Sequence, residues 1–253
     1  MQVTQRHLLY SIQSYVLGGM YLNKEIFLEE SPWSWRDFIY LLILVLVLVP
    51  FFIEYLLNNF LSKSFQNELY SGTLVGFIMS IIFMYGLYFI ALKPKRLYWN
   101  EVGLNRFPNK YWRQIPGWTL ALIVVSIALV VAMDLIGVGV DNSKTESIQS
   151  QLTPLNFFIG FVSASIISPV YEEIFYRGFL YRFLRSRYGI AIGMSVSSFI
   201  FMIVHLPTYN VLPVTFVSGL LFSWTYEKTG SVIPGIIIHG IFNGIALILT
   251  TIA

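Results

Sequence analysis

Residues 168–178, Ser-Pro-Val-Tyr-Glu-Glu-Ile-Phe-Tyr-Arg-Gly, place two adjacent glutamates and an arginine within a long apolar segment. An ionisable side chain inside a membrane span is energetically costly unless it pairs with another group or faces a water-filled cavity. Glu172, Glu173 and Arg177 therefore indicate a polar site inside a membrane protein, and the surrounding apolar residues indicate a helix that crosses the bilayer.

The composition is typical of a multispanning membrane protein with one domain, residues 1–253. Hydrophobic residues make up 56% of the chain and charged residues 11%, whereas a soluble domain carries about 25% charged residues. The mean hydropathy is +0.69. The absence of cysteine excludes disulfides and thiolate catalysis, and a net charge of +3 is too small to indicate a nucleic-acid partner.

Apolar runs long enough to cross a bilayer, roughly 17–25 residues, predict an all-α, polytopic bundle of about seven transmembrane helices. The predicted spans are 38–57, 73–92, 117–138, 155–181, 189–206, 210–227 and 231–252. In the N-terminal segment, residues 1–37, apolar side chains recur at helical spacing: Leu8, Leu9, Ile12, Tyr15 and Val16. This pattern favours an interfacial amphipathic helix, with an eighth, weakly apolar span as the alternative.

Lysine and arginine are distributed unevenly over the predicted loops. Of the 16 in the chain, most lie in the N-terminal segment, in residues 93–116 and in the turn after the fourth span, while the alternate loops hold only Lys63 and Lys144. Because cytoplasmic loops carry the excess of positive charge, the N-terminus is expected in the cytoplasm and the C-terminus outside. With no organelle signal, the expected location is a bacterial plasma membrane.

The two glutamates are predicted to have different functions. Glu173 and Arg177 are i,i+4 neighbours on a helix and are expected to pair, whereas Glu172 points to an adjacent face, where it can meet a cavity as a general base. Pro169 has no N–H group, so it loosens the helix and frees backbone carbonyls. The alternative is a purely structural ion pair that holds helices together.

Two further motifs lie in later spans. Phe201 precedes His205 by one turn, and His239 shares a helix face with Asn243. Each motif taken separately is compatible with side-chain packing or with interhelical hydrogen bonding. Taken together, a carboxylate, two imidazoles and an amide can hydrolyse an acyl bond, since they supply a base for water and donors for an oxyanion.

In order along the chain, Glu172-Glu173-x-x-x-Arg177, Phe201-x-x-x-His205 and His239-x-x-x-Asn243 resemble the three motifs of the CPBP family. This family comprises type II CAAX prenyl endopeptidases and bacterial abortive-infection or bacteriocin-processing (immunity) proteins. The resemblance covers residues 155–252, the expected catalytic core, and residues 1–150 carry no recognisable motif. It implies an intramembrane endopeptidase.

The resemblance also implies site roles. Glu172 and His205 would position and activate the water, and His239 and Asn243 would hold the oxyanion. Three residues would support the site: Glu173, Arg177 and Phe201.

The resemblance leaves the cofactor and the substrate open. The expectation is a metal-free, glutamate-dependent enzyme. The alternative is Zn²⁺ held by Glu172, His205 and His239 with an open position, although the usual His-Glu-x-x-His helix is absent. The expected partners are the lipid bilayer and a membrane-associated peptide or a lipidated, prenylated protein tail.

Two other functions remain as alternatives. One is a non-enzymatic immunity or regulatory membrane protein of the same family. The other is a proton-coupled transporter that uses Glu172 and the histidines as a relay, but paired broken helices in two related halves are not visible. Weaker candidate residues are Ser218 beside Gly219, the interfacial carboxylates Glu54 and Asp134, and His7.

A simple count of helical rise conflicts with a shared site. At about 1.5 Å per residue, His205 lies ~24 Å from the start of its span at 189, whereas Glu172 lies ~15 Å from the end of its own near 182. Helix tilt, a longer fourth helix or a buried start of the fifth span would reconcile the two depths.

Overall fold

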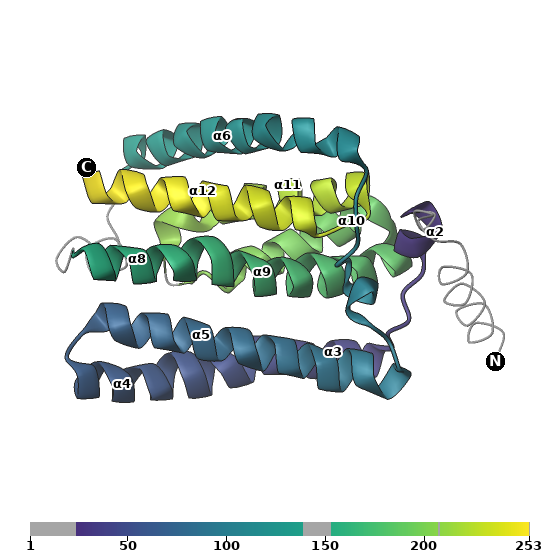
Figure 1. The fold of residues 1–253 in the computed structure, drawn as a ribbon, viewed down its shortest axis with the longest axis horizontal. Coiled ribbons are helices and arrows are strands. Elements are labelled where there is room, and N and C mark those ends of the chain that lie inside the picture. Colours follow the sequence, from purple (N-terminus) through teal and green to yellow (C-terminus); the bar gives the residue numbers. More distant parts are fainter. Residues whose placement is uncertain (1–23, 139–152, 207, 253) are drawn as a thin grey trace.

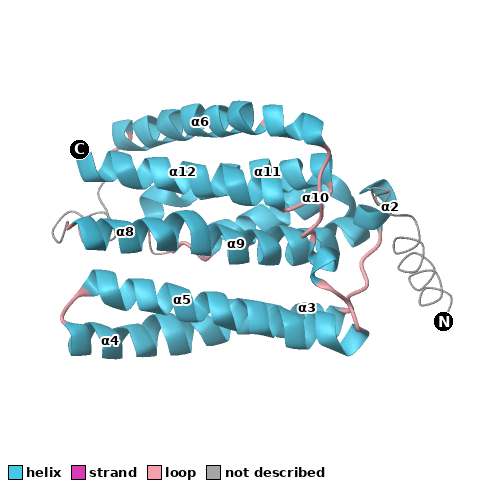
Figure 2. Ribbon diagram, in the orientation of Figure 1, coloured by secondary structure: helices cyan, strands magenta, loops and turns pink. Residues whose placement is uncertain are grey.

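A computed structural model describes residues 24–138, 153–206 and 208–252. These residues form a bundle of helices joined by short loops, and no strand occurs among them (Figure 2). The predicted all-α fold is confirmed. The predicted interfacial helix near the N-terminus lies outside the described residues.

The first part of the chain is a long helical hairpin, drawn at the bottom of Figure 1. Its segments are α3 (Trp35–Ile43), η1 (Leu44–Leu57), α4 (Asn58–Phe65), α5 (Glu68–Gly86) and η2 (Leu87–Leu92). A capping box between Ser34 and Asp37 starts α3, the first helix of this hairpin. Pro50, which cannot donate a backbone hydrogen bond, lies within the wide-turn segment η1. Gln66, in the left-handed conformation, ends α4 and turns the chain back.

Short helical segments, of which η3 and η5 are basic, gather at one end of the bundle, where they precede and follow long helices (Figure 1). They are α2 (Lys24–Glu29), η3 (Lys93–Lys95), η4 (Trp99–Val102) and η5 (Asn109–Arg113). The long helix α6 (Ile115–Leu135) leaves this end and runs along the edge of the bundle. The basic loop predicted at residues 93–116 therefore lies at a single end of the molecule.

The helix that carries the glutamates is longer than predicted. It is made of α8 (Pro154–Val162), η6 (Ser163–Ile167), α9 (Ser168–Glu173), η7 (Ile174–Tyr181) and the first turns of α10 (Arg182–Ile203). Residues 182–188 were expected in a turn, but they are helical. The helical conformation breaks at Gly189, with φ 80° and ψ 177°, a region of backbone space that is essentially restricted to glycine.

The chain reverses direction at Gly189. A Cβ atom placed on Gly193 would lie 2.9 Å from the Cα atom of Arg185, and the Arg177 guanidinium lies 4.3 Å from the Phe201 ring centroid. Contacts that pair residues at equal distances on both sides of Gly189 define two antiparallel helices. These two halves correspond to the predicted fourth and fifth spans.

The last helices complete the bundle. They are the short η8 (Tyr209–Val211), α11 (Leu212–Thr229) and α12 (Ile233–Ile252). Gly230, in the left-handed conformation, ends α11. In Figure 1, α12 runs between α6 and the helix formed by α8 and α9.

Five helices among the described residues are long and apolar enough to cross a membrane. They are Trp35–Phe65, Glu68–Lys95, Ile115–Leu135, Pro154–Ile203 and Ile233–Thr251. The fourth of these contains both halves of the hairpin at Gly189. The protein is therefore a multi-pass membrane protein in architecture, and the count of seven crossings stays a prediction.

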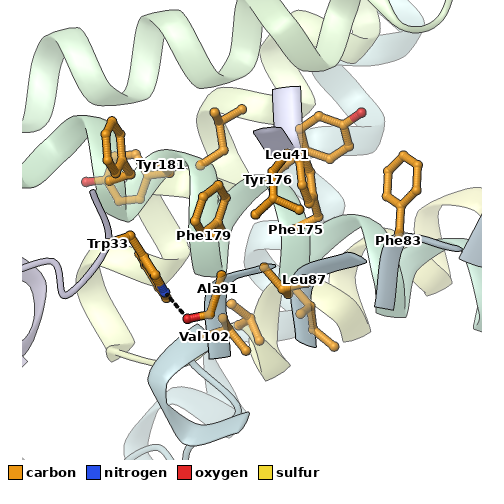
Figure 3. Close-up of a cluster of buried hydrophobic side chains, with 14 of the residues drawn as sticks. Trp33, Leu41, Phe83, Leu87, Ala91, Val102, Phe175, Tyr176, Phe179 and Tyr181 are labelled. Carbon is orange, nitrogen blue, oxygen red and sulfur yellow. Dashed lines mark hydrogen bonds between the residues drawn. The ribbon is translucent and has the colours of Figure 1, made fainter. Parts of the chain in front are cut away.

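The core of the bundle is centred on η7, in which every side chain is buried. Figure 3 shows Phe175, Tyr176 and Phe179 of this segment surrounded by Leu41, Phe83 and Leu87 from the first hairpin and by Trp33, whose indole N–H donates to the Ala91 carbonyl at 3.2 Å. Burial on all sides fixes the rotation of this helix. The positions of Glu172, Glu173 and Arg177 follow from that rotation.

Candidate active site

Glu173 is the centre of a buried polar cluster. Its side chain is fully buried, and its Oε1 atom accepts hydrogen bonds from Arg177 Nη1 and His239 Nδ1, each at 3.0 Å. The predicted i,i+4 pair between Glu173 and Arg177 is confirmed. Gly235 on α12 lies directly against Glu173, since a Cβ atom there would be 3.1 Å from Oε2. Glu173 therefore connects α9 to α12.

Glu172 occupies a different environment from its neighbour. Its side chain retains 13% exposure. Oε1 accepts a hydrogen bond from the Ser168 hydroxyl, and Oε2 lies 3.8 Å from His239 Nε2. His239 thus faces Glu173 with one ring nitrogen and Glu172 with the other.

Aromatic rings enclose the charged groups. The Arg177 guanidinium lies 4.3 Å from the Phe201 ring centroid and 5.0 Å from that of Phe222. The His239 ring stacks on Phe222 at 4.8 Å and meets the edge of Phe201 at 6.0 Å. Arginine on aromatic faces is stabilised by cation–π attraction, which is strongest where water is excluded. Phe201 and Phe222 therefore hold both partners of Glu173, Arg177 and His239.

His205 follows the end of α10 and lies beside Phe201. Its Nδ1 atom is 2.7 Å from the Phe201 carbonyl, and its ring meets the edge of the Phe201 ring at 4.8 Å. Because the fourth helix continues to residue 188, Glu172 and His205 lie at nearly the same number of residues from the reversal at Gly189, 17 and 16. Both lie ~24 Å along their helices. The longer fourth helix thus resolves the conflict in depth.

Asn243 is held by the irregular helix that precedes the glutamates. Its Nδ2 atom donates to the Ala164 carbonyl at 3.0 Å. In η6 the Ser168 N–H donates to the Ser163 carbonyl, five residues earlier. With the same spacing, the Ala164 carbonyl would accept from the N–H of residue 169, but residue 169 is a proline and has none. Pro169 therefore frees a carbonyl, as predicted, and Asn243 binds it.

The structure brings most of the predicted site residues into one cluster. Those in direct contact with one another are Glu172, Glu173, Arg177, Phe201 and His239. His205 joins them through Phe201, and Asn243 lies one turn after His239 on α12.

Two residues of the cluster were missed by the sequence analysis. The i,i+4 spacing of Ser168 and Glu172 could have indicated their contact, but serine in an apolar helix is commonly a packing residue. Nothing in the sequence indicated Phe222, because a phenylalanine in an apolar helix does not reveal which residue it stacks on.

The weaker candidate Ser218 makes contacts typical of helix packing, and His7 lies outside the described residues. The Ser218 hydroxyl donates to the Val214 carbonyl of its own helix, and Gly219 packs closely against Ser198, as expected for helix packing. Among the described residues, no three side chains of His, Asp or Glu are arranged to hold a metal ion. Glu172, His205 and His239 do not form such a group among these residues, and the metal-free mechanism stays a prediction.

Comparison with known proteins agrees with the three motifs. Residues 154–245 match the family model described as type II CAAX prenyl endopeptidase Rce1-like. The chain is 30% identical over 216 residues to the membrane-embedded CAAX protease MroQ of Staphylococcus aureus (strain USA300), covering 78% of this chain and 85% of that protein. It is 27% identical over 135 residues to the putative membrane peptidase YdiL of Bacillus subtilis (strain 168), about half of either chain.

No solved structure matches the chain. The match to MroQ extends over most of both proteins, well beyond the segment that carries the motifs. With the motifs in order and their side chains in one cluster, this protein belongs to the Rce1-like family of CAAX proteases.

Proposed function

We propose that this protein is an intramembrane endopeptidase in which Glu172 activates the attacking water. The main support is the contrast between two adjacent carboxylates. Glu173 is fully buried and bound to both Arg177 and His239, whereas Glu172 is partly exposed and keeps one oxygen near His239 Nε2. Only Glu172 is in a position to meet a water and a substrate carbonyl.

The reaction follows from the chemistry of these groups. The gap of 3.8 Å between Glu172 Oε2 and His239 Nε2 is too long for a direct hydrogen bond and suits a bridging water. Glu172 takes a proton from that water. At the same time, the oxygen of the water adds to the carbon of the peptide carbonyl. The protonated Glu172 then gives the proton to the leaving nitrogen as the C–N bond breaks.

The developing oxyanion needs hydrogen-bond donors near the base. We assign this role to Asn243 and to Nε2 of His239 in the form that carries a proton on both ring nitrogens, with Nδ1–H bound to Glu173. The Asn243 amide has two N–H groups, of which one binds the Ala164 carbonyl and the second can face the oxyanion. His205 is assigned to the water with Glu172, and Glu173 with Arg177 and Phe201 fixes the ring of His239.

The family and the setting of the site support a proposal for the substrate class. The residues lie in apolar helices, so the scissile bond belongs to a membrane-associated peptide or to a lipidated protein tail. The relative MroQ is described as a CAAX protease, which is compatible with a prenylated tail. We place the protein in the plasma membrane of a bacterium, with its N-terminus in the cytoplasm.

Peptide cleavage by purified protein in lipid nanodiscs tests the proposal. Wild type is compared with Glu172→Gln, which keeps the shape of the side chain but cannot take a proton. Glu68→Gln, an exposed carboxylate at the start of α5, is the matched control. We expect Glu172→Gln to lose at least about 100-fold in kcat and Glu68→Gln to match wild type.

Two other results of this assay are informative. Activity that survives in Glu172→Gln would contradict the proposed base and favour a binding or transport function. We expect a chelator to leave cleavage unchanged. Loss of activity on chelation, restored by Zn²⁺, would overturn the metal-free mechanism.

A further inference from the structure

The two oxygens of the Glu172 carboxylate have different partners. Oε1 accepts the hydrogen bond of the Ser168 hydroxyl, and Oε2 faces His239 Nε2 at 3.8 Å. A glutamate side chain has three rotatable bonds, and its carboxylate must be fixed if one oxygen is to act as a base. The Ser168 contact restricts this rotation.

Ser168 departs from the usual behaviour of serines in these helices. A serine hydroxyl within a helix commonly bonds to a carbonyl of the preceding turn. Ser218 donates to the Val214 carbonyl at 2.7 Å and Ser80 to the Phe77 carbonyl at 2.7 Å. The Ser168 hydroxyl instead bonds a carboxylate one turn ahead.

Local backbone structure accounts for the position of Ser168. It is the first residue of α9, directly after the wide turn η6 and before Pro169. Its N–H is bound to the Ser163 carbonyl. Ser168 and Glu172 are i,i+4 neighbours, so both side chains lie on one helix face.

We propose that Ser168 is a positioning residue for peptide hydrolysis. Its hydroxyl holds Oε1 of Glu172, so that Oε2 is the oxygen that faces His239 and takes the proton from water. This inference rests on the proposed role of Glu172 as the base. Ser168 touches the base and is not assigned a contact with the substrate.

Three serine variants, assayed in nanodiscs on the same peptide, test this role. Ser168→Ala removes the hydroxyl, and Ser168→Thr keeps it. Ser165→Ala is the matched control, because it removes a serine hydroxyl from the same helix, and that hydroxyl is buried without a hydrogen-bond partner in the described part of the chain. We expect Ser168→Ala to lower kcat about tenfold or more, as for loss of a charge-assisted hydrogen bond. KM should stay within about twofold, since substrate binding is not affected.

The kcat of Ser168→Thr and the thermal midpoints of the variants distinguish a positioning role of Ser168 from a role in folding. Ser168→Thr should recover most of the lost kcat, and Ser165→Ala should retain wild-type kcat. All three variants should share the thermal midpoint of wild type. An equal loss of kcat in Ser168→Ala and Ser168→Thr, or a loss that follows a lowered midpoint, would overturn the positioning role.

The same assay includes Glu172→Gln, which separates this inference from the proposed function. If Glu172→Gln is inactive and Ser168→Ala keeps full kcat, Ser168 does not position the base, while the function stands. If Glu172→Gln keeps its activity, the proposed function itself fails.

Discussion

Glu173 and Arg177 form an ion pair with almost no access to solvent. Within the described residues, Glu173 Oε2 and Arg177 Nε and Nη2 are buried without a hydrogen-bond partner. Removing charges from water costs free energy that a single contact at 3.0 Å does not always recover. The faces of Phe201 and Phe222 stabilise the arginine. The pair is therefore better explained by the geometry it gives His239 than by stability.

Removal of one partner of this pair should be strongly destabilising. Arg177→Met leaves the Glu173 carboxylate buried without its cation, at an expected cost of about 3–5 kcal/mol in the free energy of unfolding. Equilibrium unfolding in mixed micelles measures this change. Arg113→Gln, at an exposed arginine of η5, should stay within about 0.5 kcal/mol.

The double variant Glu173→Gln with Arg177→Met sharpens this prediction. Because both charges are gone, it should be less destabilised than Arg177→Met alone. A double variant that is less stable than either single variant would contradict the view that the unpaired buried charge causes the loss.

At the scale of elements, the turn at Gly189 sets the register of the site. Gly189 has φ 80° and ψ 177°, and open space surrounds the position of a Cβ atom there. An added side chain would therefore meet backbone strain and no steric clash. The reversal at this residue places Phe201 over Arg177 and brings His205 to the level of Glu172.

Gly189→Ala should lower the free energy of unfolding by about 1–3 kcal/mol, the cost of holding a non-glycine residue in this conformation. Thermal unfolding in detergent measures the loss. Gly117→Ala is the matched control, because it also has open space but lies in a helix, where alanine is favoured. A Gly189→Ala protein as stable as wild type would mean that the turn can adopt another conformation.

Close packing of α12 against η6 sets the distance between the glutamates and the residues of the last helix. A Cβ atom on Gly240 would lie 2.4 Å from the Ser165 carbonyl oxygen, which belongs to the backbone and cannot rotate away. Gly240→Ala should therefore displace α12 and lower kcat about tenfold or more, since small displacements of catalytic groups are costly. Gly72→Ala in α5, with open space around it, should retain wild-type kcat. Equal kcat in both variants would contradict this account.

The features of the fold and the site that could be predicted from the sequence are those set by periodicity within one helix. The apolar runs gave the all-α class, and the i,i+4 spacing of Glu173 and Arg177 gave their contact. Ser168 and Phe222 were missed because their partners follow from helix rotation and interhelical packing. The extent of the fourth helix was missed because residues 182–188 are rich in arginine and resemble a loop.

The partners of those arginines come from distant segments. Arg182 donates to the carbonyls of Phe27 and Glu30 and pairs with Glu101 at 3.0 Å, and Arg185 pairs with Glu227 at 2.9 Å. A charged stretch can therefore continue a helix when other segments satisfy its charges. Such partners cannot be read from local sequence.

At the scale of the whole molecule, the positive charges gather at one end of the bundle. The short segments α2, η3, η4 and η5 lie at this end, and Arg187, two residues before the turn at Gly189, donates to the Trp33 carbonyl there. The turn between α4 and α5 and the last turn of α12 lie at the other end (Figure 1). The helices Trp35–Phe65, Glu68–Lys95, Ile115–Leu135 and α12 run between these two ends (Figure 1). The positive-inside rule predicts that the basic end faces the cytoplasm.

The absence of cysteine allows this orientation to be tested with single thiols. Asn109→Cys places an exposed thiol in η5 at the basic end, and Ser64→Cys places one near the opposite end, in α4. In intact bacterial cells, a membrane-impermeant maleimide should label Ser64→Cys and should label Asn109→Cys only after lysis. Equal labelling of both in denatured samples controls for expression. The reverse pattern would place the basic end, and with it the N-terminus, outside the cell and contradict the predicted topology.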